Sequence, residues 1–282
     1  KMVNKFYRNK KILVTGATGF KGAWLCLWLN EMGAKVYGIG YSPNKNKNLF
    51  YKLKLNKKIK YSLIDIRNLK KLKRIIKNFK PEIVFHMAAQ PLIIKGYTDP
   101  HDTYTINSIG TLNILEILKT NKVVKSIICI TSDKCHKNNN SVKGFVENDS
   151  LGGEDPYSGS KACAEIIANT YYQSFFKNKR KCGLATVRAG NVIGGGDWSE
   201  NRLIPDCIKS INSNKTIVLR NPYFNRPWQH VLEPLNGYLI LAKKLYENPL
   251  KFSSAWNFGS EKNTVTDVLT VVKKIIKIWG KG

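Results

Sequence analysis

The feature that most constrains the fold is an alternation of short apolar segments with longer amphipathic ones. Four amphipathic segments carry apolar residues at helical spacing: 20–32, 69–79, 102–119 and 157–176. Six others are short and almost continuously apolar, as strands buried on both faces of a sheet are: 11–15, 35–40, 59–64, 82–87, 125–130 and 184–187. Strands and helices in this order predict an α/β protein, a doubly wound parallel sheet covered by helices on both faces.

The alternation ends after residue 187. Residues 188–228 are rich in Gly, Asn, Arg and Pro, with one expected helix, 203–212, and one expected strand, 216–219. An expected helix, 235–246, and an expected strand, 255–258, resemble the elements of the first part. We therefore expect the chain to leave the main sheet, build a smaller unit and return.

Composition excludes some classes of protein. Of 282 residues, 43% are hydrophobic, so the chain can bury a sizeable core. No apolar run reaches the roughly 18 residues that span a membrane, and the run after the N-terminus is too short for a secretory signal. The six cysteines (Cys26, Cys129, Cys135, Cys163, Cys182 and Cys207) form no CxxC pair and no zinc-like spacing with the histidines. We expect reduced, mostly buried thiols, no metal, no membrane contact and a cytoplasmic location.

The net charge of +28 is large enough to attract nucleic acid, anionic lipid or phosphorylated substrates. The lysines are spread along the chain, and no arginine–aromatic interleaving typical of single-strand binding is present. The pattern favours a solvated, lysine-rich surface and no nucleic-acid partner. A genuine electrostatic role is the alternative.

A glycine-rich segment, Gly16-Ala-Thr-Gly-Phe-Lys-Gly22, follows the first expected strand and opens the first expected helix. Glycines let the backbone turn tightly beside a pyrophosphate, and the helix N-terminus offers N–H groups and a partial positive charge. This context predicts a dinucleotide-binding loop. Its expected contacts are Gly16, Thr18, Gly19, Phe20, Lys21 and Gly22.

The expected strand 35–40 ends without the acid that commonly holds the ribose of NAD, so this site leaves NAD and NADP open. Ser42 is placed to hydrogen-bond a ribose, and Lys45 or Lys47 to meet a phosphate. Asp65 is placed for the adenine amino group, with a helix cap as the alternative. The other expected cofactor contacts follow strands or lie on the next helix: Ile66, Ala88, Ala89, Gln90 and Asn107.

Tyr157 and Lys161 lie one helical turn apart on the same face of an expected helix. A tyrosine has an ordinary pKa of about 10, and a nearby ammonium group favours the phenolate. Such a pair can take a proton from a sugar hydroxyl while the adjacent carbon gives hydride to nicotinamide. Ser132, Asp133 and Lys134 follow another strand, where a hydroxyl and two ionisable groups suit acid–base work.

Together these motifs resemble the extended short-chain dehydrogenase/reductases, over nearly the whole chain. Six segments sharpen the resemblance to the CDP-glucose 4,6-dehydratase branch of that family: 15–22, 131–135, 155–161, 188–198, 202–206 and 226–235. The resemblance implies a Rossmann-like fold, NAD as cofactor, CDP-glucose as substrate, and a product used for deoxysugar and O-antigen-type polysaccharides.

The resemblance implies a role for each catalytic candidate. Tyr157 would deprotonate the glucose 4-hydroxyl, and Lys161 would lower the tyrosine pKa and hold the nicotinamide ribose. Ser132 would hydrogen-bond the reacting 4-oxygen. Asp133 would protonate the departing 6-hydroxyl, while Lys134 would act as base near C5. Related dehydratases acting on dTDP-glucose carry glutamate in place of Lys134, and a lysine must be neutral to act as a base.

The resemblance also implies the domain organisation. Residues 1–187, with 229–259 returning, would form the NAD-binding Rossmann domain. Residues 188–228 and 260–282 would form a smaller C-terminal substrate-binding lobe, which looks truncated. The expected substrate contacts are Arg188, Asn191, Arg202, Leu203, Ile204, Arg220 and Arg226.

A homodimer through the helices at 102–119 and 157–176 is implied as well. Three alternatives stay open. The chain could be another nucleotide-sugar 4,6-dehydratase, an epimerase that shares the first oxidation, or a non-catalytic NAD- or nucleic-acid-binding homologue.

Overall fold

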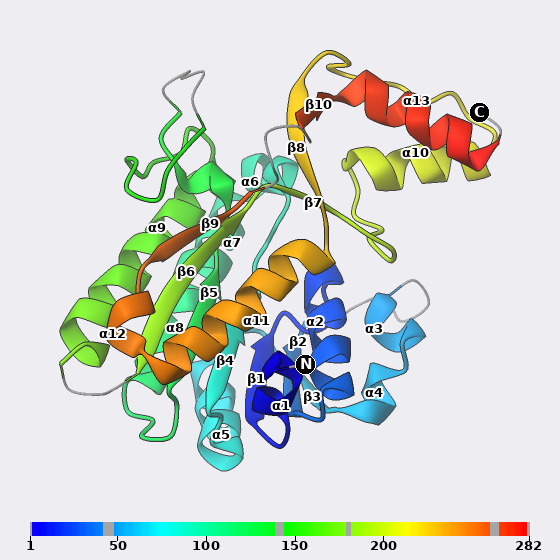
Figure 1. Cartoon of the computed structure of the whole chain (residues 1–282). Coiled ribbons are helices and arrows are strands. Elements are labelled where there is room, and N and C mark those ends of the chain that lie inside the picture. The colour runs from blue at the N-terminus through cyan, green and yellow to red at the C-terminus, as the bar shows by residue number, and fades with distance from the viewer. Residues whose placement is uncertain (1, 42–47, 139–143, 179–181, 260–264, 281–282) are drawn as a thin grey trace.

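A computed structural model describes residues 2–41, 48–138, 144–178, 182–259 and 265–280. Its main sheet has seven strands, all parallel, in the order β3-β2-β1-β4-β5-β6-β9 (Figure 1). These strands are β1 (Lys11–Thr15), β2 (Lys35–Gly40), β3 (Lys60–Leu63), β4 (Ile83–His86), β5 (Ser126–Ile130), β6 (Gly183–Ala189) and β9 (Ala255–Phe258). The predicted α/β fold with a doubly wound parallel sheet is confirmed.

Helices precede, connect and follow the strands. They are α1 (Met2–Tyr7), α2 (Phe20–Glu31), α3 (Leu49–Lys52), α4 (Leu55–Lys58), α5 (Leu69–Phe79), α6 (Ile93–Thr98), α7 (Pro100–Tyr104), α8 (Gly110–Leu118), α9 (Pro156–Tyr171), α10 (Leu203–Asn212), α11 (Leu232–Glu247), α12 (Pro249–Phe252) and α13 (Val268–Trp279). Two π-helical segments, η1 (Thr105–Ile109) and η3 (Tyr172–Phe176), continue α7 and α9, and a 3-10 turn, η2 (Asp133–Cys135), follows β5.

Two apolar cores lie on opposite faces of the main sheet. Ile12 and Val14 point into the core shared with α2 and α11, while Leu13 points into the core shared with α5, α8 and α9. Because neighbouring residues of a strand face opposite sides, both sets must be apolar. This packing accounts for the continuous apolar runs of the sequence.

The smaller unit is a three-stranded sheet with two helices beside it. Strand β8 (Asn225–His230) pairs in parallel with β7 (Asn191–Ile193) and antiparallel with β10 (Val265–Asp267). Helices α10 and α13 pack against each other, apart from the main sheet (Figure 1). Strand β9 lies beside β6 in the main sheet, so the chain does return to it.

One predicted element is wrong. Residues 216–219 form no strand, and Val218 is 84% exposed. A β-branched run becomes a strand only when a neighbouring strand covers it. In this unit, β8 takes its partners from β7 and β10 instead.

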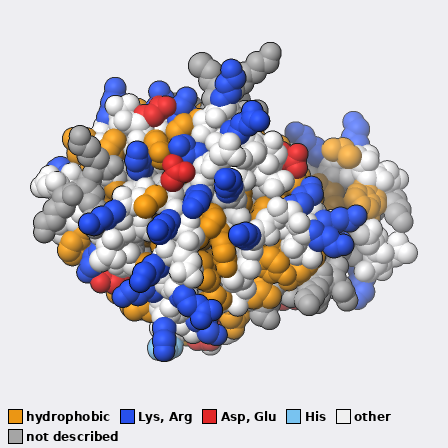
Figure 2. Space-filling view, turned by 90° about the horizontal axis from the view of Figure 1, so that it is seen from below, with side chains coloured by type: hydrophobic (Ala, Val, Ile, Leu, Met, Phe, Trp, Pro, Cys, Tyr) orange, Lys and Arg blue, Asp and Glu red, His pale blue; other side chains and the backbone are white. Residues whose placement is uncertain are grey.

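Lysine and arginine side chains are scattered over the face seen in Figure 2, separated by apolar and uncharged side chains, with few acidic ones among them. This distribution matches the expected dispersed surface better than a single binding stripe. Five of the six cysteine side chains are buried, as predicted. Among the described residues, no helix is long and apolar enough to cross a membrane, and no cluster of His, Cys, Asp or Glu could hold a metal ion.

Candidate active site

The glycine-rich loop joins β1 to α2 and can be built only from glycine at two of its positions. Gly16 has a φ of +74°, and a Cβ there would lie 2.8 Å from the backbone nitrogen of Ala88. A Cβ on Gly22 would lie 2.0 Å from the carbonyl oxygen of Gly16. Gly19 caps α2 without any side-chain hydrogen bond. The helix N-terminus therefore opens at the carboxyl end of β1, where a pyrophosphate can approach its N–H groups.

The other predicted cofactor residues surround this loop. Asn107, on η1, accepts a hydrogen bond from the Gln90 backbone (2.8 Å) and donates one back to its carbonyl oxygen (3.1 Å). These bonds fix the turn after β4 that carries Ala88 and Ala89. The hydroxyl of buried Thr18 donates to the carbonyl of Tyr41 (3.3 Å).

Two cofactor predictions have other outcomes. Ser42, like Lys45 and Lys47, lies outside the described residues. The Asp65 carboxylate is occupied locally, since it accepts hydrogen bonds from the Arg67 backbone (2.8 Å) and guanidinium (2.6 Å). These bonds hold the pKa of Asp65 below its ordinary value. Asp65 therefore stabilises the turn after β3, a local structural role similar to the helix cap that was its alternative. The neighbouring Ile66 is buried.

A cavity of about 1050 Å³ opens at the carboxyl ends of β5 and β6, between the main sheet and the smaller unit. All five catalytic candidates line it: Ser132, Asp133, Lys134, Tyr157 and Lys161. Three of the predicted cofactor residues, Phe20, Lys21 and Ala89, line it too. The structure thus brings the start of α2, the segment after β5 and the start of α9 to a single space.

Helix α9 begins with Pro156, and Asp155 caps it by accepting a hydrogen bond from the backbone of Ser158 (3.0 Å). This start places Tyr157 in the first turn, and both it and Lys161 are buried. The Lys161 ammonium donates to the carbonyl oxygen of Ile130 (3.3 Å), at the end of β5. The pair is therefore fixed between α9 and the sheet.

The pKa values of the pair depart from the expectation in one respect. Burial raises the pKa of Tyr157, although a hydrogen bond with Ser132 works in the opposite direction. The expected lowering of this pKa is therefore not what the structure shows by itself. Burial and, to a smaller extent, the nearby Lys21 ammonium together lower the pKa of Lys161 to about 8. Lys21, also facing the cavity, has its pKa lowered to about 8 by burial and by Arg202.

The Lys161 shift has a consequence for stability. An ammonium group whose pKa falls from 10.5 to about 8 on folding costs about 3 kcal/mol while it is protonated, below pH 8. The lost hydrogen bond to Ile130 offsets about 1 kcal/mol of that. At pH 7 we expect Lys161→Met to raise the free energy of unfolding, measured with urea, by about 2 kcal/mol. The gain should shrink as pH rises from 8 to 10, because the parent then sheds the buried charge. Equal or lower stability of the variant at pH 7 would contradict this.

Ser132, Asp133 and Lys134 lie at the 3-10 turn η2. The buried Ser132 hydroxyl accepts a hydrogen bond from the Lys134 backbone (3.2 Å) and donates to the Asp133 carboxylate (3.1 Å). The Asp133 and Lys134 side chains are exposed to the cavity. One hydroxyl next to the tyrosine and two ionisable groups facing a sugar-sized space can move protons at more than one sugar atom.

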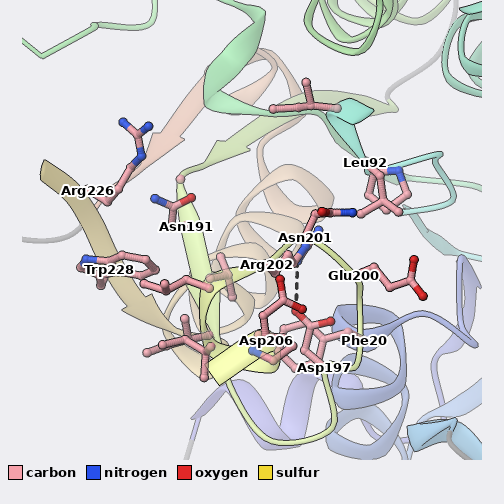
Figure 3. Close-up of a pocket in the computed structure, with 18 of the residues that line it drawn as sticks. Phe20, Leu92, Asn191, Asp197, Glu200, Asn201, Arg202, Asp206, Arg226 and Trp228 are labelled. Atoms are coloured by element: carbon pink, nitrogen blue, oxygen red, sulfur yellow. Dashed lines mark hydrogen bonds and ion pairs between the residues drawn. The ribbon is translucent and has the colours of Figure 1, made fainter. Parts of the chain in front are cut away.

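Most predicted substrate residues line the opposite side of the cavity. Figure 3 shows Asn191 on β7 near Arg226 and Trp228 on β8, with the Asp197–Arg202 pair nearer α10. The Arg202 guanidinium lies 3.1 Å from the Asp197 carboxylate. Leu203, Ile204 and Arg220 also line the cavity.

Arg188 is the exception and the prediction for it needs correction. It is only 3% exposed, does not line the cavity, and forms a double hydrogen bond with Glu165 (2.9 Å each). Because it lies buried near the carboxyl end of strand β6, its charge must be paired inside the protein. The sequence reasoning also missed Glu165 itself. Its position four residues after Lys161, on the same helix face, was the available signal.

The parallel sheet, the glycine-rich loop after β1, and a tyrosine and lysine one helical turn apart are the features on which the resemblance to the extended short-chain dehydrogenase/reductases rests. The family model described as GDP-mannose 4,6 dehydratase matches residues 13–255. The chain therefore belongs to this family, and it is an extended short-chain dehydrogenase/reductase of the nucleotide-sugar dehydratase type.

Individual proteins are similar over most of the chain. A Salmonella typhimurium protein named CDP-glucose 4,6-dehydratase is 48% identical over 99% of this chain and 79% of that protein. A Dictyostelium discoideum dTDP-D-glucose 4,6-dehydratase is 29% identical over 95% of this chain and 62% of that protein. The solved structure of a Bacillus anthracis dTDP-glucose 4,6-dehydratase in complex with NAD has a TM-score of 0.81 at 23% identity, covering 97% of this chain and 82% of that one.

Proposed function

We propose that the chain converts CDP-glucose to CDP-4-keto-6-deoxyglucose with NAD as its cofactor. The observation that carries the proposal is the meeting of five groups, Tyr157, Lys161 and the side chains of 132–134, in one cavity beside the glycine-rich loop. The 48% identity to the Salmonella CDP-glucose 4,6-dehydratase supports the choice of substrate. The NAD complex of the similar B. anthracis fold supports the choice of cofactor.

The residues of this chain fit such a cofactor. The α2 N-terminus with Gly16 and Gly22 would hold the pyrophosphate, while Phe20 and Lys161 would border the reactive ring at the cavity. Bound NAD would supply the acceptor for a hydride from C4 of glucose and return it to C6. The positive charge of the oxidised ring would also favour the Tyr157 phenolate, against the effect of burial.

The remaining proton transfers fall to side chains of the cavity. Tyr157 takes the proton of the 4-hydroxyl while Ser132 hydrogen-bonds the same oxygen. The 4-ketone makes the C5 proton acidic, and Lys134, in its neutral form, removes it. Asp133, in its protonated form, gives a proton to the departing 6-hydroxyl, so that one water leaves across C5 and C6. Once the hydride is returned to C6, the proton that Lys134 took goes back to C5 and completes the 4-keto-6-deoxy sugar. Arg202, Arg220 and Arg226 would bind the pyrophosphate of the substrate.

Mass spectrometry tests the proposal. The protein is incubated with NAD and, separately, with CDP-glucose, dTDP-glucose, GDP-mannose and UDP-N-acetylglucosamine. We expect loss of one water from CDP-glucose in preference to the others. Dehydration of another nucleotide sugar would keep the reaction and replace the substrate. A change of configuration at C4 without loss of water would replace dehydration by epimerisation.

We also propose that the protein is a homodimer through α7, η1 and α9. The outer face of these segments exposes Tyr104 (39%), Ile109 (45%) and Ile166 (55%) around an apolar hollow of about 410 Å³ that Cys163 also lines. A contiguous apolar surface of this kind marks a protein interface.

Ile166→Glu is expected to convert the dimer into a monomer, because it places a charge in the apolar surface that the proposed dimer would bury. Sedimentation velocity at micromolar concentration measures the mass. Leu250→Glu is the matched control, since Leu250 is 70% exposed on α12, which packs with α11 on the face of the main sheet opposite to α9. A monomeric parent, or a monomeric Leu250→Glu, would count against the proposed interface.

A further inference from the structure

A buried carboxylate packs against the segment that carries three catalytic candidates, residues 132–134, which we call the catalytic segment. Glu165, on α9, is 4% exposed. It accepts hydrogen bonds from the hydroxyl groups of Thr131 (2.5 Å) and Thr186 (2.6 Å), and two from the Arg188 guanidinium (2.9 Å each). The Cys135 thiol lies 4.0 Å from the same carboxylate. Glu165 does not line the cavity, so it does not touch substrate.

Two partners of Glu165, Thr131 and Cys135, lie at either end of the catalytic candidates 132–134 in the sequence. Thr131 directly precedes the segment 132–134 and Cys135 directly follows it, so Glu165 contacts both ends of that segment. Glu165 also lies one helical turn after Lys161 and two turns after Tyr157, on the same face of α9. The Glu165 side chain thereby connects helix α9, which carries Tyr157 and Lys161, to segment 132–134.

Arg188, which is bonded to Glu165, makes further contacts with the chain that follows the catalytic segment. Its guanidinium donates to the carbonyl oxygen of Glu147 (3.0 Å) and lies 3.2 Å from the His136 ring nitrogen. The Glu147 carboxylate accepts a hydrogen bond from the backbone of Asn257, on β9 (2.9 Å). The chain that leaves the catalytic segment is therefore tied to β6 and β9 as well.

We propose that Glu165 and Arg188 are positioning residues, which hold segment 132–134 at a fixed place relative to Tyr157. The proposal rests on the dehydratase function proposed above. Oxidation at C4 needs Tyr157, while removal of water needs Asp133 and Lys134 on the same bound sugar. Because η2 is a single 3-10 turn in which the Asp133 and Lys134 side chains are exposed, it depends on the buried residues that it packs against to keep that geometry. A displacement of about 1 Å at such a site can cost about 100-fold in rate.

The two threonines offer a matched pair of variants. Thr131→Val and Thr186→Val each remove one hydroxyl hydrogen bond to Glu165, on Oε1 and Oε2 respectively. Thr131 precedes the catalytic segment and itself lines the cavity, whereas Thr186 lies within β6 and away from the cavity, so a hydrogen-exchange measurement is needed beside kcat. Both should lose stability, because a buried bond to a charged group is lost in each, and Thr131→Val also loses the longer contact of its hydroxyl with the Val187 carbonyl oxygen (3.2 Å).

Only Thr131→Val should change the reaction. We expect its kcat for CDP-glucose to fall about tenfold with KM within twofold, and a larger share of sugar to be released as the 4-ketone without loss of water. Thr186→Val should keep the kcat and the product ratio of the parent. Equal losses of kcat in both variants, or none in Thr131→Val, would reduce the network to a purely structural role and overturn the proposal.

Hydrogen exchange separates this proposal from the proposed function. Backbone amides of residues 132–136 should exchange at least tenfold faster in Thr131→Val than in the parent or in Thr186→Val, whatever substrate the protein takes. Unchanged protection of this segment in Thr131→Val would overturn the positioning role even if the protein dehydrates CDP-glucose. Faster exchange in a protein that dehydrates no nucleotide sugar would keep the positioning of the segment and overturn the function.

Discussion

Replacing Tyr157 with phenylalanine is expected to lower kcat for dehydration of CDP-glucose by about 10³-fold. The change removes one oxygen atom, the group that takes the proton of the 4-hydroxyl, and leaves a ring of the same shape at the cavity wall. Because the ring is retained, KM and the amount of bound NAD should stay within about threefold of the parent. Product formation is measured by mass spectrometry, and NAD is measured after the protein is denatured.

Tyr171→Phe is the matched control for this variant. Tyr171 lies on the same helix, and its hydroxyl donates to Glu116 (2.7 Å) rather than facing the cavity. Its loss should affect stability by about 1–2 kcal/mol and leave kcat unchanged. If Tyr157→Phe retained more than a tenth of the parent rate, another group would have to be the base, and Lys21 or Lys161, with pKa values of about 8, would be the next to test.

Local signals in the sequence predicted the elements that carry the site. The glycine-rich loop was predictable because a single stretch of seven residues fixes its turn, its close approach and the start of α2. Tyr157 and Lys161 were predictable as neighbours because helical spacing alone brings them to one face. Segment 132–134 was placed with them because the carboxyl ends of parallel strands share one edge of a sheet.

Features that depend on a distant partner were not predictable in this way. Arg188 resembled a ligand for pyrophosphate, but its environment is set by Glu165, 23 residues earlier in the chain. The run 216–219 has strand composition, but strand formation depends on the neighbour that β8 selects. Likewise the pKa of Tyr157 depends on how deeply the fold buries the ring, which no local spacing reveals.

The pairing of Arg188 with Glu165 is also expected to contribute strongly to the stability of the protein. Arg188→Met is expected to lower the free energy of unfolding by about 3–5 kcal/mol, because it leaves a carboxylate buried at 4% exposure without its charged partner. Urea unfolding at pH 7 measures the change. Methionine fills most of the volume of the arginine stem, so a cavity contributes little to the loss.

A double-mutant cycle separates the pair from the packing around it. Glu165→Gln keeps a carbonyl oxygen for only one of the two threonine hydroxyl groups and places an amide NH2 group beside the other, and it leaves the arginine charge unpaired in the single variant. The double variant contains neither charge, so it should be more stable than the sum of the two single losses implies, by about 1–3 kcal/mol. Additive losses would mean that the two charges do not stabilise each other. The network beneath the catalytic segment would then be held by the neutral hydrogen bonds alone, and Thr131→Val, rather than any charge substitution, would become the variant that most disturbs the segment.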